Sequence, residues 1–252
     1  MAEWFEQLKT QILQWFEQVK SEFILNFIDG DRWKLLAEGL KTTFEITIIA
    51  VLMGIVIGIL VAIVRSSYDK NGEQMHGLSK AILSIFNSIA KIYLTVIRGT
   101  PVVVQLLIMY YIIFASSNNK MLIAILSFGI NSGAYVAEIF RSGIMSIDSG
   151  QLEAGRALGL SYVQTMLRII IPQAFKNVLP ALANELIVLL KETSVAGYVA
   201  MTDLTRAGNI IRGVTFSAFM PLIAVALIYL IVVMILTKLV SLLERRLRAS
   251  DH

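Results

Sequence analysis

One uninterrupted apolar run limits what this chain can fold into. Residues Phe44 to Val64 read FEITIIAVLMGIVIGILVAIV and carry a single charge, that of Glu45. Roughly 20 predominantly apolar residues are needed to cross a bilayer as a helix, whereas helices in globular proteins average about 10–14 residues. The run therefore predicts an integral membrane protein.

The composition agrees with this class and excludes others. Hydrophobic residues make up 56% of the 252 residues and charged residues only 16%, whereas soluble domains are about a quarter charged. The net charge is +4, but the basic residues lie beside the ends of apolar runs, where they act as topology signals. We therefore expect no nucleic-acid partner. The chain has no cysteine and only two histidines, His76 and His252, so we expect it to bind no metal or cofactor.

The first 30 residues form an arm that differs from the rest of the chain. Their apolar residues recur at helical spacing, which predicts an amphipathic helix at the membrane interface with tryptophans at headgroup depth. The polar face mixes Glu, Gln and Lys and is not basic, so packing on a partner subunit remains the alternative. The apolar positions are Trp4, Phe5, Leu8, Ile12, Trp15, Phe16, Val19 and Phe23.

The remaining chain predicts an all-α transmembrane domain over residues 35–245. Gly54 and Gly58, four residues apart in the first span, permit close helix packing. As one helix, residues 81–115 would be about 52 Å long, and Pro101 interrupts the helical hydrogen bonds. We therefore expect a partly interfacial helix, a break at RGTP and a second span starting near there. The five expected spans cover about 42–64, 98–115, 121–145, 174–195 and 219–241.

Five spans place the two termini on opposite sides of the membrane. If the C-terminus is cytoplasmic, so are the 65–80 connection and the 146–173 segment, and basic residues are then enriched inside, as the positive-inside rule requires. We therefore expect the N-terminus outside and the C-terminus in the cytoplasm. The basic residues on the cytoplasmic side are Arg65, Lys70, Lys80, Arg156, Arg168, Arg245, Arg246 and Arg248.

A charged, glycine-containing segment separates the third and fourth expected spans. Residues 151–173 read QLEAGRALGLSYVQTMLRIIIPQ, which suits a short helix with Asp148 or Ser149 as its N-cap. Gly155 and Gly159 lie one turn apart and would let another surface approach the backbone closely. Two interpretations follow from the residues alone. The helix transmits force from a cytoplasmic partner into both flanking spans, or it merely reverses the chain.

This segment closely resembles the EAA loop of permease subunits in ABC (ATP-binding cassette) importers. The family pattern is Glu-Ala-Ala, three residues, Gly, nine residues, Ile, one residue, Leu-Pro. Other stretches, RGTPVVVQL, NSGAYVAEIFRSGI and PQAFKNVLPALANELIVLLKETS, resemble the polar amino acid branch of the family and extend the resemblance over residues 35–245. The loop pattern is matched by Glu153, Ala154, Gly155, Gly159, Ile169, Ile171 and Pro172, with Gly155 replacing Ala and Ile171 replacing Leu.

The resemblance implies the type I ABC importer fold and a role as permease subunit of an ATP-driven importer of polar amino acids, with basic ones as one option. It implies a dimer of permease subunits, identical or different, resting on two ABC ATPase subunits in the cell membrane of a prokaryote. An extracytoplasmic substrate-binding protein would deliver the amino acid. The chain has no GxxxxGK[ST] phosphate loop, so ATP and Mg are expected in the partner ATPase and this chain is expected not to be an enzyme.

The resemblance also implies the mechanism. The segment 148–172 would hold a coupling helix, at about 150–160, seated in a cleft of the ATPase. Closure of the ATPase subunits would move this helix and switch the pathway from inward-open to outward-open. The residues expected to couple are Glu153, Ala154, Gly155, Arg156 and Gly159.

Polar and ionisable groups inside a membrane usually face a cavity or a partner. An amino acid brings a carboxylate, which Arg98 or a helix N-terminus would meet, and an ammonium group, which Glu138 would meet. Glu185 or Glu45 would meet a basic side chain. Two alternatives remain open: Glu138 forms a local ion pair with Arg141, or selectivity belongs to the binding protein alone. The candidate pathway residues are Arg98, Gln105, Asn131, Tyr135, Glu138, Asn184 and Glu185.

A self-contained amino acid carrier driven by an ion gradient is the alternative function. Such carriers usually contain two internally related halves, and no repeat relates residues 40–115 to residues 120–195. The sequence therefore favours the ATP-driven importer.

Overall fold

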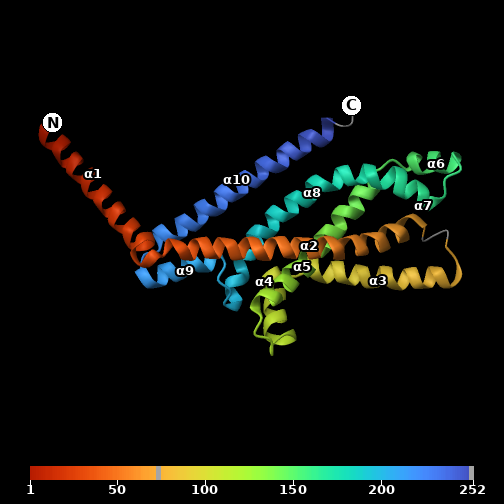
Figure 1. Cartoon of the computed structure of the whole chain (residues 1–252), viewed down its shortest axis with the longest axis horizontal. Coiled ribbons are helices and arrows are strands. Elements are labelled where there is room, and N and C mark those ends of the chain that lie inside the picture. The colour runs from red at the N-terminus through yellow and green to blue at the C-terminus, as the bar shows by residue number, and fades with distance from the viewer. Residues whose placement is uncertain (72–74, 250–252) are drawn as a thin grey trace.

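The computed structural model describes residues 1–71 and 75–249, and the regular structure in this part is entirely helical. Figure 1 shows α2 and α3 side by side along the long axis, with α5 crossing them and α1 projecting from one end. The side chains of Lys70 and Arg248, used in the orientation argument, lie outside the described part. The long helices are α1 (Ala2–Phe23), α2 (Trp33–Asn71), α3 (Gly77–Gly99), α5 (Lys120–Met145), α8 (Ile171–Glu192) and α10 (Phe219–Ala249).

Four helices of the described part are long and apolar enough to cross a membrane. They are Trp33–Asp69 of α2, the whole of α3 and α5, and Phe219–Leu247 of α10. At 22 residues α8 is also long enough for a crossing, but its polar residues lower its hydropathy. The fourth expected span, 174–195, corresponds to α8.

The second expected span, 98–115, differs from the structure. The helix breaks at Thr100 and Pro101, as the proline predicts. After the break, α4 (Val102–Ile108) has seven residues and the π-helical turn η3 (Met109–Ile113) five, about 18 Å together. This is shorter than the hydrocarbon core of about 30 Å. The length needed for a crossing therefore lies in the 23 residues of α3, before the break.

The centre of the fold is the contact of α2 with α5. A β-carbon on Gly54 would stand 3.0 Å from Cβ of Ser132, and one on Gly58 would stand 2.8 Å from the backbone nitrogen of Ala137. The two glycines therefore allow the close packing that their spacing predicts. Beside this contact lies the main apolar cluster, in which α2, α4, α5 and α8 each bury aliphatic or aromatic side chains: Ile46, Leu106, Phe128 and Leu189.

Short polar helices cap the two ends of the molecule (Figure 1). One end holds α6 (Ser149–Ala157) and α7 (Tyr162–Thr165), which the π-helical turn η4 (Met166–Ile170) joins to α8. The other end holds α9 (Leu204–Thr215), which packs on α2 and α10, and the 3-10 helix η5 (Thr193–Val199), which buries Ala196 and Val199 in the main apolar cluster. Asp203 caps α9 by accepting hydrogen bonds from the backbone nitrogens of Thr205 and Arg206.

The N-terminal arm is an amphipathic helix, as its spacing predicts. Most of its described side chains are exposed, including Trp4, Phe5, Trp15 and Phe16 of its apolar face. The arm joins the body at the π-helical turn η1 (Ile24–Ile28), where Thr215 of α9 donates a hydrogen bond to the buried Asn26. Both alternatives for the apolar face of α1, contact with a membrane surface and packing on a partner subunit, therefore stay open.

Candidate coupling surface and transport pathway

The segment between α5 and α8 folds as a short helix with defined ends. Asp148 is the N-cap of α6, as expected, and accepts a hydrogen bond of 2.7 Å from the backbone nitrogen of Gly150. After α6 the chain turns at Gly159, whose φ of +80° favours glycine. Ser161 then starts α7 with a capping box shared with Gln164. These local hydrogen bonds hold the segment in one shape.

The expected coupling residues divide between two faces of this segment. Gly155 is buried against Thr165 of α7, so its close contact is made within the chain and not with a partner. The others are exposed, and nothing lies within 4 Å of a β-carbon built on Gly159. Leu158 beside them is 79% exposed, so the outer face offers an apolar group among charged ones. The exposed coupling residues are Glu153, Ala154, Arg156 and Gly159.

Arg98, Tyr135 and Glu138 lie together between α3 and α5. The guanidinium of Arg98 is centred 5.5 Å from the ring centroid of Tyr135, and its Nη1 lies 4.0 Å from Oε2 of Glu138. Glu138 also forms the expected local ion pair, because Nη2 of Arg141 lies 2.5 Å from its Oε1. The carboxylate thus has one tight and one loose cationic partner.

The ion pairs continue from this group into α2. Arg141 Nη1 lies 3.5 Å from Oδ2 of Asp69, and Arg65 Nη1 lies 4.0 Å from Oδ1 of the same carboxylate. Arg65 also donates to Asn87 of α3 at 2.7 Å. From the sequence, Arg65 is only a topology signal, and Asp69 is not among the predicted site residues. Their i, i+4 spacing on one helix is the signal that would have identified the pair.

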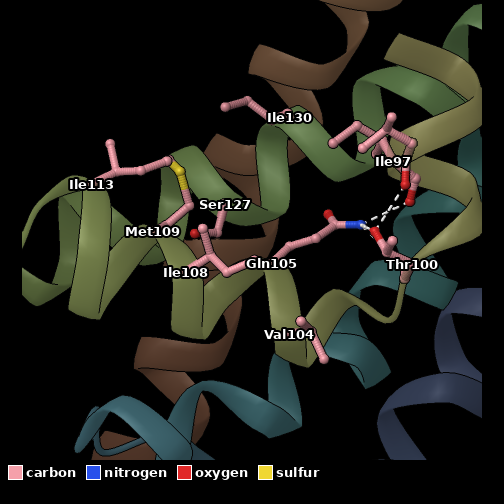
Figure 2. A pocket seen from close by; sticks show the side chains of 10 residues that line it. Ile97, Thr100, Val104, Gln105, Ile108, Met109, Ile113, Ser127 and Ile130 are labelled. Atoms are coloured by element: carbon pink, nitrogen blue, oxygen red, sulfur yellow. Dashed lines mark hydrogen bonds between the residues drawn. The ribbon is translucent and has the colours of Figure 1, made fainter. Parts of the chain in front are cut away.

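Gln105 and Asn131 form a second group at the break between α3 and α4. Nε2 of Gln105 donates to the carbonyl of Ile97 at 2.7 Å and to Oγ1 of Thr100 at 2.9 Å, as Figure 2 shows. Its Oε1 accepts from Nδ2 of Asn131 at 3.0 Å. Both ends of the amide are therefore used within the chain: the nitrogen caps carbonyls freed at the break, and the oxygen accepts from Asn131.

A cavity of about 240 Å³ lies beside Gln105. Aliphatic side chains of α3, α4 and α5 make most of its wall, and Figure 2 shows Gln105 extending across it. Ser127 also lines it, with a hydroxyl that is buried and has no hydrogen-bond partner in the described part. The cavity is thus an apolar space with a few polar groups.

Glu185 and Asn184 point to different sides of α8. Glu185 is 8% exposed and accepts a hydrogen bond of 2.8 Å from Oγ of Ser132, whereas Asn184 is exposed. Ser132 follows Asn131 directly, so α5 brings Glu185 near the Gln105 group. Ser132 is not among the predicted site residues, because a serine inside a helix carries no local signal of a partner 53 residues away.

The fold defines a helical membrane protein with polar and charged groups between its helices and a short capped helix exposed at one end. Residues 77–249 match the family described as "Binding-protein-dependent transport system inner membrane component". The chain belongs to this family of transporter permease components. It is therefore a multi-pass membrane protein, of a kind that is not itself catalytic.

Curated relatives cover most of the chain. The chain is 37% identical over 218 residues to the glutamine transport system permease protein GlnP of Escherichia coli K12, covering 85% of this chain and 93% of the relative. It is 35% identical over 219 residues to the arginine transport system permease protein ArtQ of Bacillus subtilis, covering 86% and 94%.

Solved structures agree with the fold. A chain of an amino acid ABC transporter crystallised with histidines superposes with a TM-score of 0.76 at 38% identity, covering 87% of this chain and 98% of that chain. A chain of the MetNI methionine ABC transporter superposes with a TM-score of 0.71 at 20% identity, covering 85% and 97%, which supports the fold alone. The expected type I ABC importer fold is confirmed, and the self-contained carrier is set aside.

Proposed function

We propose that this chain is the permease subunit of an ATP-driven importer of polar amino acids. The observation that carries the proposal is the coverage of the chain by permeases named for glutamine and arginine transport, together with its superposition on an amino acid ABC transporter. The EAA-like segment supports it independently, because its exposed residues lie on a short helix suited to docking.

In this proposal the chain dimerises with an identical or different permease subunit and rests on two ATPase subunits that hold ATP and Mg. A substrate-binding protein meets the opposite end. The basic residues beside α6 and at the end of α10 favour the C-terminus in the cytoplasm and the N-terminus outside. The assembly lies in the cell membrane of a prokaryote.

Movement of the ATPase reaches the membrane through α6. Because Gly155 fixes α6 on α7 and η4 joins α7 to α8 without a loop, a displacement of α6 carries the start of α8 with it. The direct links of this segment to both α5 and α8 suit a rigid-body switch between inward-open and outward-open states.

The group formed by Arg98, Tyr135 and Glu138 suits the amino acid backbone. Its loose Arg98–Glu138 pair, at 4.0 Å, leaves each group able to accept a new partner, the carboxylate at Arg98 and the ammonium at Glu138. Glu138→Gln should then change substrate-stimulated ATPase activity in the reconstituted complex. Unchanged kinetics and selectivity would make Glu138 a structural residue and leave selectivity to the binding protein.

The decisive experiment reconstitutes this chain in proteoliposomes with the ATPase and binding protein encoded beside it. We expect uptake of radiolabelled glutamine or arginine that needs ATP, the binding protein and a hydrolysis-competent ATPase. Uptake should persist when ionophores dissipate the ion gradients. Uptake without ATP, driven by an ion gradient, would overturn the proposal.

A further inference from the structure

A polar cavity lies between η5 and α9, at the end of the molecule opposite α6 (Figure 1). Its volume is about 340 Å³ and it opens to the surface, a size within the range of small-molecule sites. In the proposed orientation this end faces outside. The described residues that line it are Ser194, Gly197, Tyr198, Thr205, Arg206 and Asn209.

Arg206 is the charged residue of this lining, and its charge is not neutralised locally. Its Nη1 donates to the carbonyl of Gly197 at 2.8 Å, which fixes the half-buried side chain at the cavity wall. Its other guanidinium nitrogens have no hydrogen bond, and no carboxylate of the described part forms an ion pair with it. A planar guanidinium held in this way keeps donors free for a carboxylate.

The neighbouring side chains also keep their polar groups free. Within the described residues, the side chains of Ser194, Tyr198 and Asn209 form no hydrogen bonds. Tyr198 is 67% exposed, and an aromatic face is a suitable contact for an ammonium group. The cavity thus holds one fixed cation, several free donors and an aromatic ring, and none of its described lining residues is acidic.

From this arrangement we propose that the cavity is a binding site for the carboxylate of a free amino acid, separate from the Arg98–Glu138 group in the membrane. The inference rests on the proposed function, which supplies the ligand class and the outward position. The site receives the amino acid at the outer mouth of the pathway, with its carboxylate on Arg206.

The chain has no cysteine, so one introduced thiol can report on this cavity. Asn209→Cys places a thiol in the lining of the cavity, and Val214→Cys places one on the same helix outside it, at a residue that is 58% exposed. The rate of reaction with a methanethiosulfonate reagent is measured in the nanodisc-embedded complex, without binding protein. Probes are L-arginine and L-glutamine and their carboxamides, which lack the carboxylate.

We expect the free amino acids to slow reaction at position 209 but not at position 214, and the carboxamides to have no effect. In an Arg206→Gln background the concentration needed for protection should rise about tenfold or more, as for loss of a charge-assisted hydrogen bond. In an Arg206→Lys background, which keeps the charge, the concentration needed for protection should lie between those for Arg206 and for Arg206→Gln.

Absence of protection, or equal protection by the carboxamides, would overturn the proposal that the cavity binds the carboxylate of an amino acid. If Arg206→Gln does not fold, the comparison of free amino acids with their carboxamides in the Asn209→Cys chain still tests the proposal. ATP-driven uptake by the complex with the unsubstituted chain separates the two claims: uptake without protection refutes this site and leaves the importer assignment intact.

Discussion

A β-carbon built on Gly155 would stand 2.7 Å from Oγ1 of Thr165, closer than real β-carbons come to other atoms. Thr165 is fully buried, and its hydroxyl donates to the carbonyl of Ser161 at 3.0 Å. The hydroxyl therefore has little freedom to move aside. The contact packs α6 and α7 as a single unit, and in the proposed function this unit passes motion of the outer face of α6 to α8.

Gly155→Val should separate α6 from α7. Overpacking of this kind costs about 1–3 kcal/mol, and we expect it to disorder the segment while α2 and α5 keep their packing. ATP-driven uptake should fall to background in proteoliposomes although the protein inserts normally. The matched control is Gly213→Val in α9, a helical glycine with nothing within 4 Å of its β-carbon position. Normal uptake by the Gly155→Val variant would show that uptake does not depend on the packing of α6 against α7.

Gly159 offers a different comparison, because its φ of +80° is strained for any side chain while the space around it is open. Gly159→Ala and Gly159→Trp should therefore have similar thermal stability, each bearing about 1–2 kcal/mol of backbone strain. Only the tryptophan should block ATP-driven uptake, since its bulk meets the ATPase. Equal uptake by the two variants would show that no partner surface approaches Gly159.

The parts of this fold that could be predicted are those set by local patterns. The run from Phe44 gives the core of α2, Gly54 and Gly58 give its packing on α5, and Asp148 caps α6 as its residue type indicates. Each depends on a few neighbouring residues and on general rules of helix formation. The position of Pro101 likewise gives the break.

The parts that could not be predicted depend on contacts distant in sequence. The carboxylate of Glu185 meets Ser132 only because α8 lies on α5, and Arg141 meets Asp69 across 72 residues. The helix α9 was not predicted, although Asp203 is a local N-cap signal for it; its packing on α2 and α10 could not be predicted. The position of the Arg206 guanidinium at the cavity wall depends on the same packing of α9.

Gln105→Ala should weaken the break between α3 and α4. The variant leaves the carbonyl of Ile97 without this donor and the amide of Asn131, 2% exposed, without its acceptor. Unsatisfied buried groups cost about 1–3 kcal/mol each, so the midpoint of thermal unfolding in detergent should fall by several degrees. Thr100→Ala is the control, because it removes one acceptor of the three and should cost less. Equal losses in both variants would show that Gln105 does not hold the break.

Asp203 predicts a pH dependence at the end of the molecule that holds α9. Burial raises the pKa of its carboxyl above the ordinary value, although the backbone nitrogens of Thr205 and Arg206 donate to it. The native state therefore holds the proton more tightly than the unfolded chain. The contribution of Asp203 to the free energy of unfolding is thus fully present below the ordinary aspartate pKa of about 3.9, and is lost as pH rises through the native pKa.

Asp203→Asn keeps an N-cap acceptor and removes the titration. We therefore expect the variant to gain stability relative to the parent protein as the pH is raised from about 4. Thermal unfolding of both proteins in the same detergent, in steps from acidic to neutral pH, measures this difference. The gain should level off once the pH exceeds the native pKa. A difference that stays constant over the whole range would show that the Asp203 carboxyl titrates alike in the native and unfolded states.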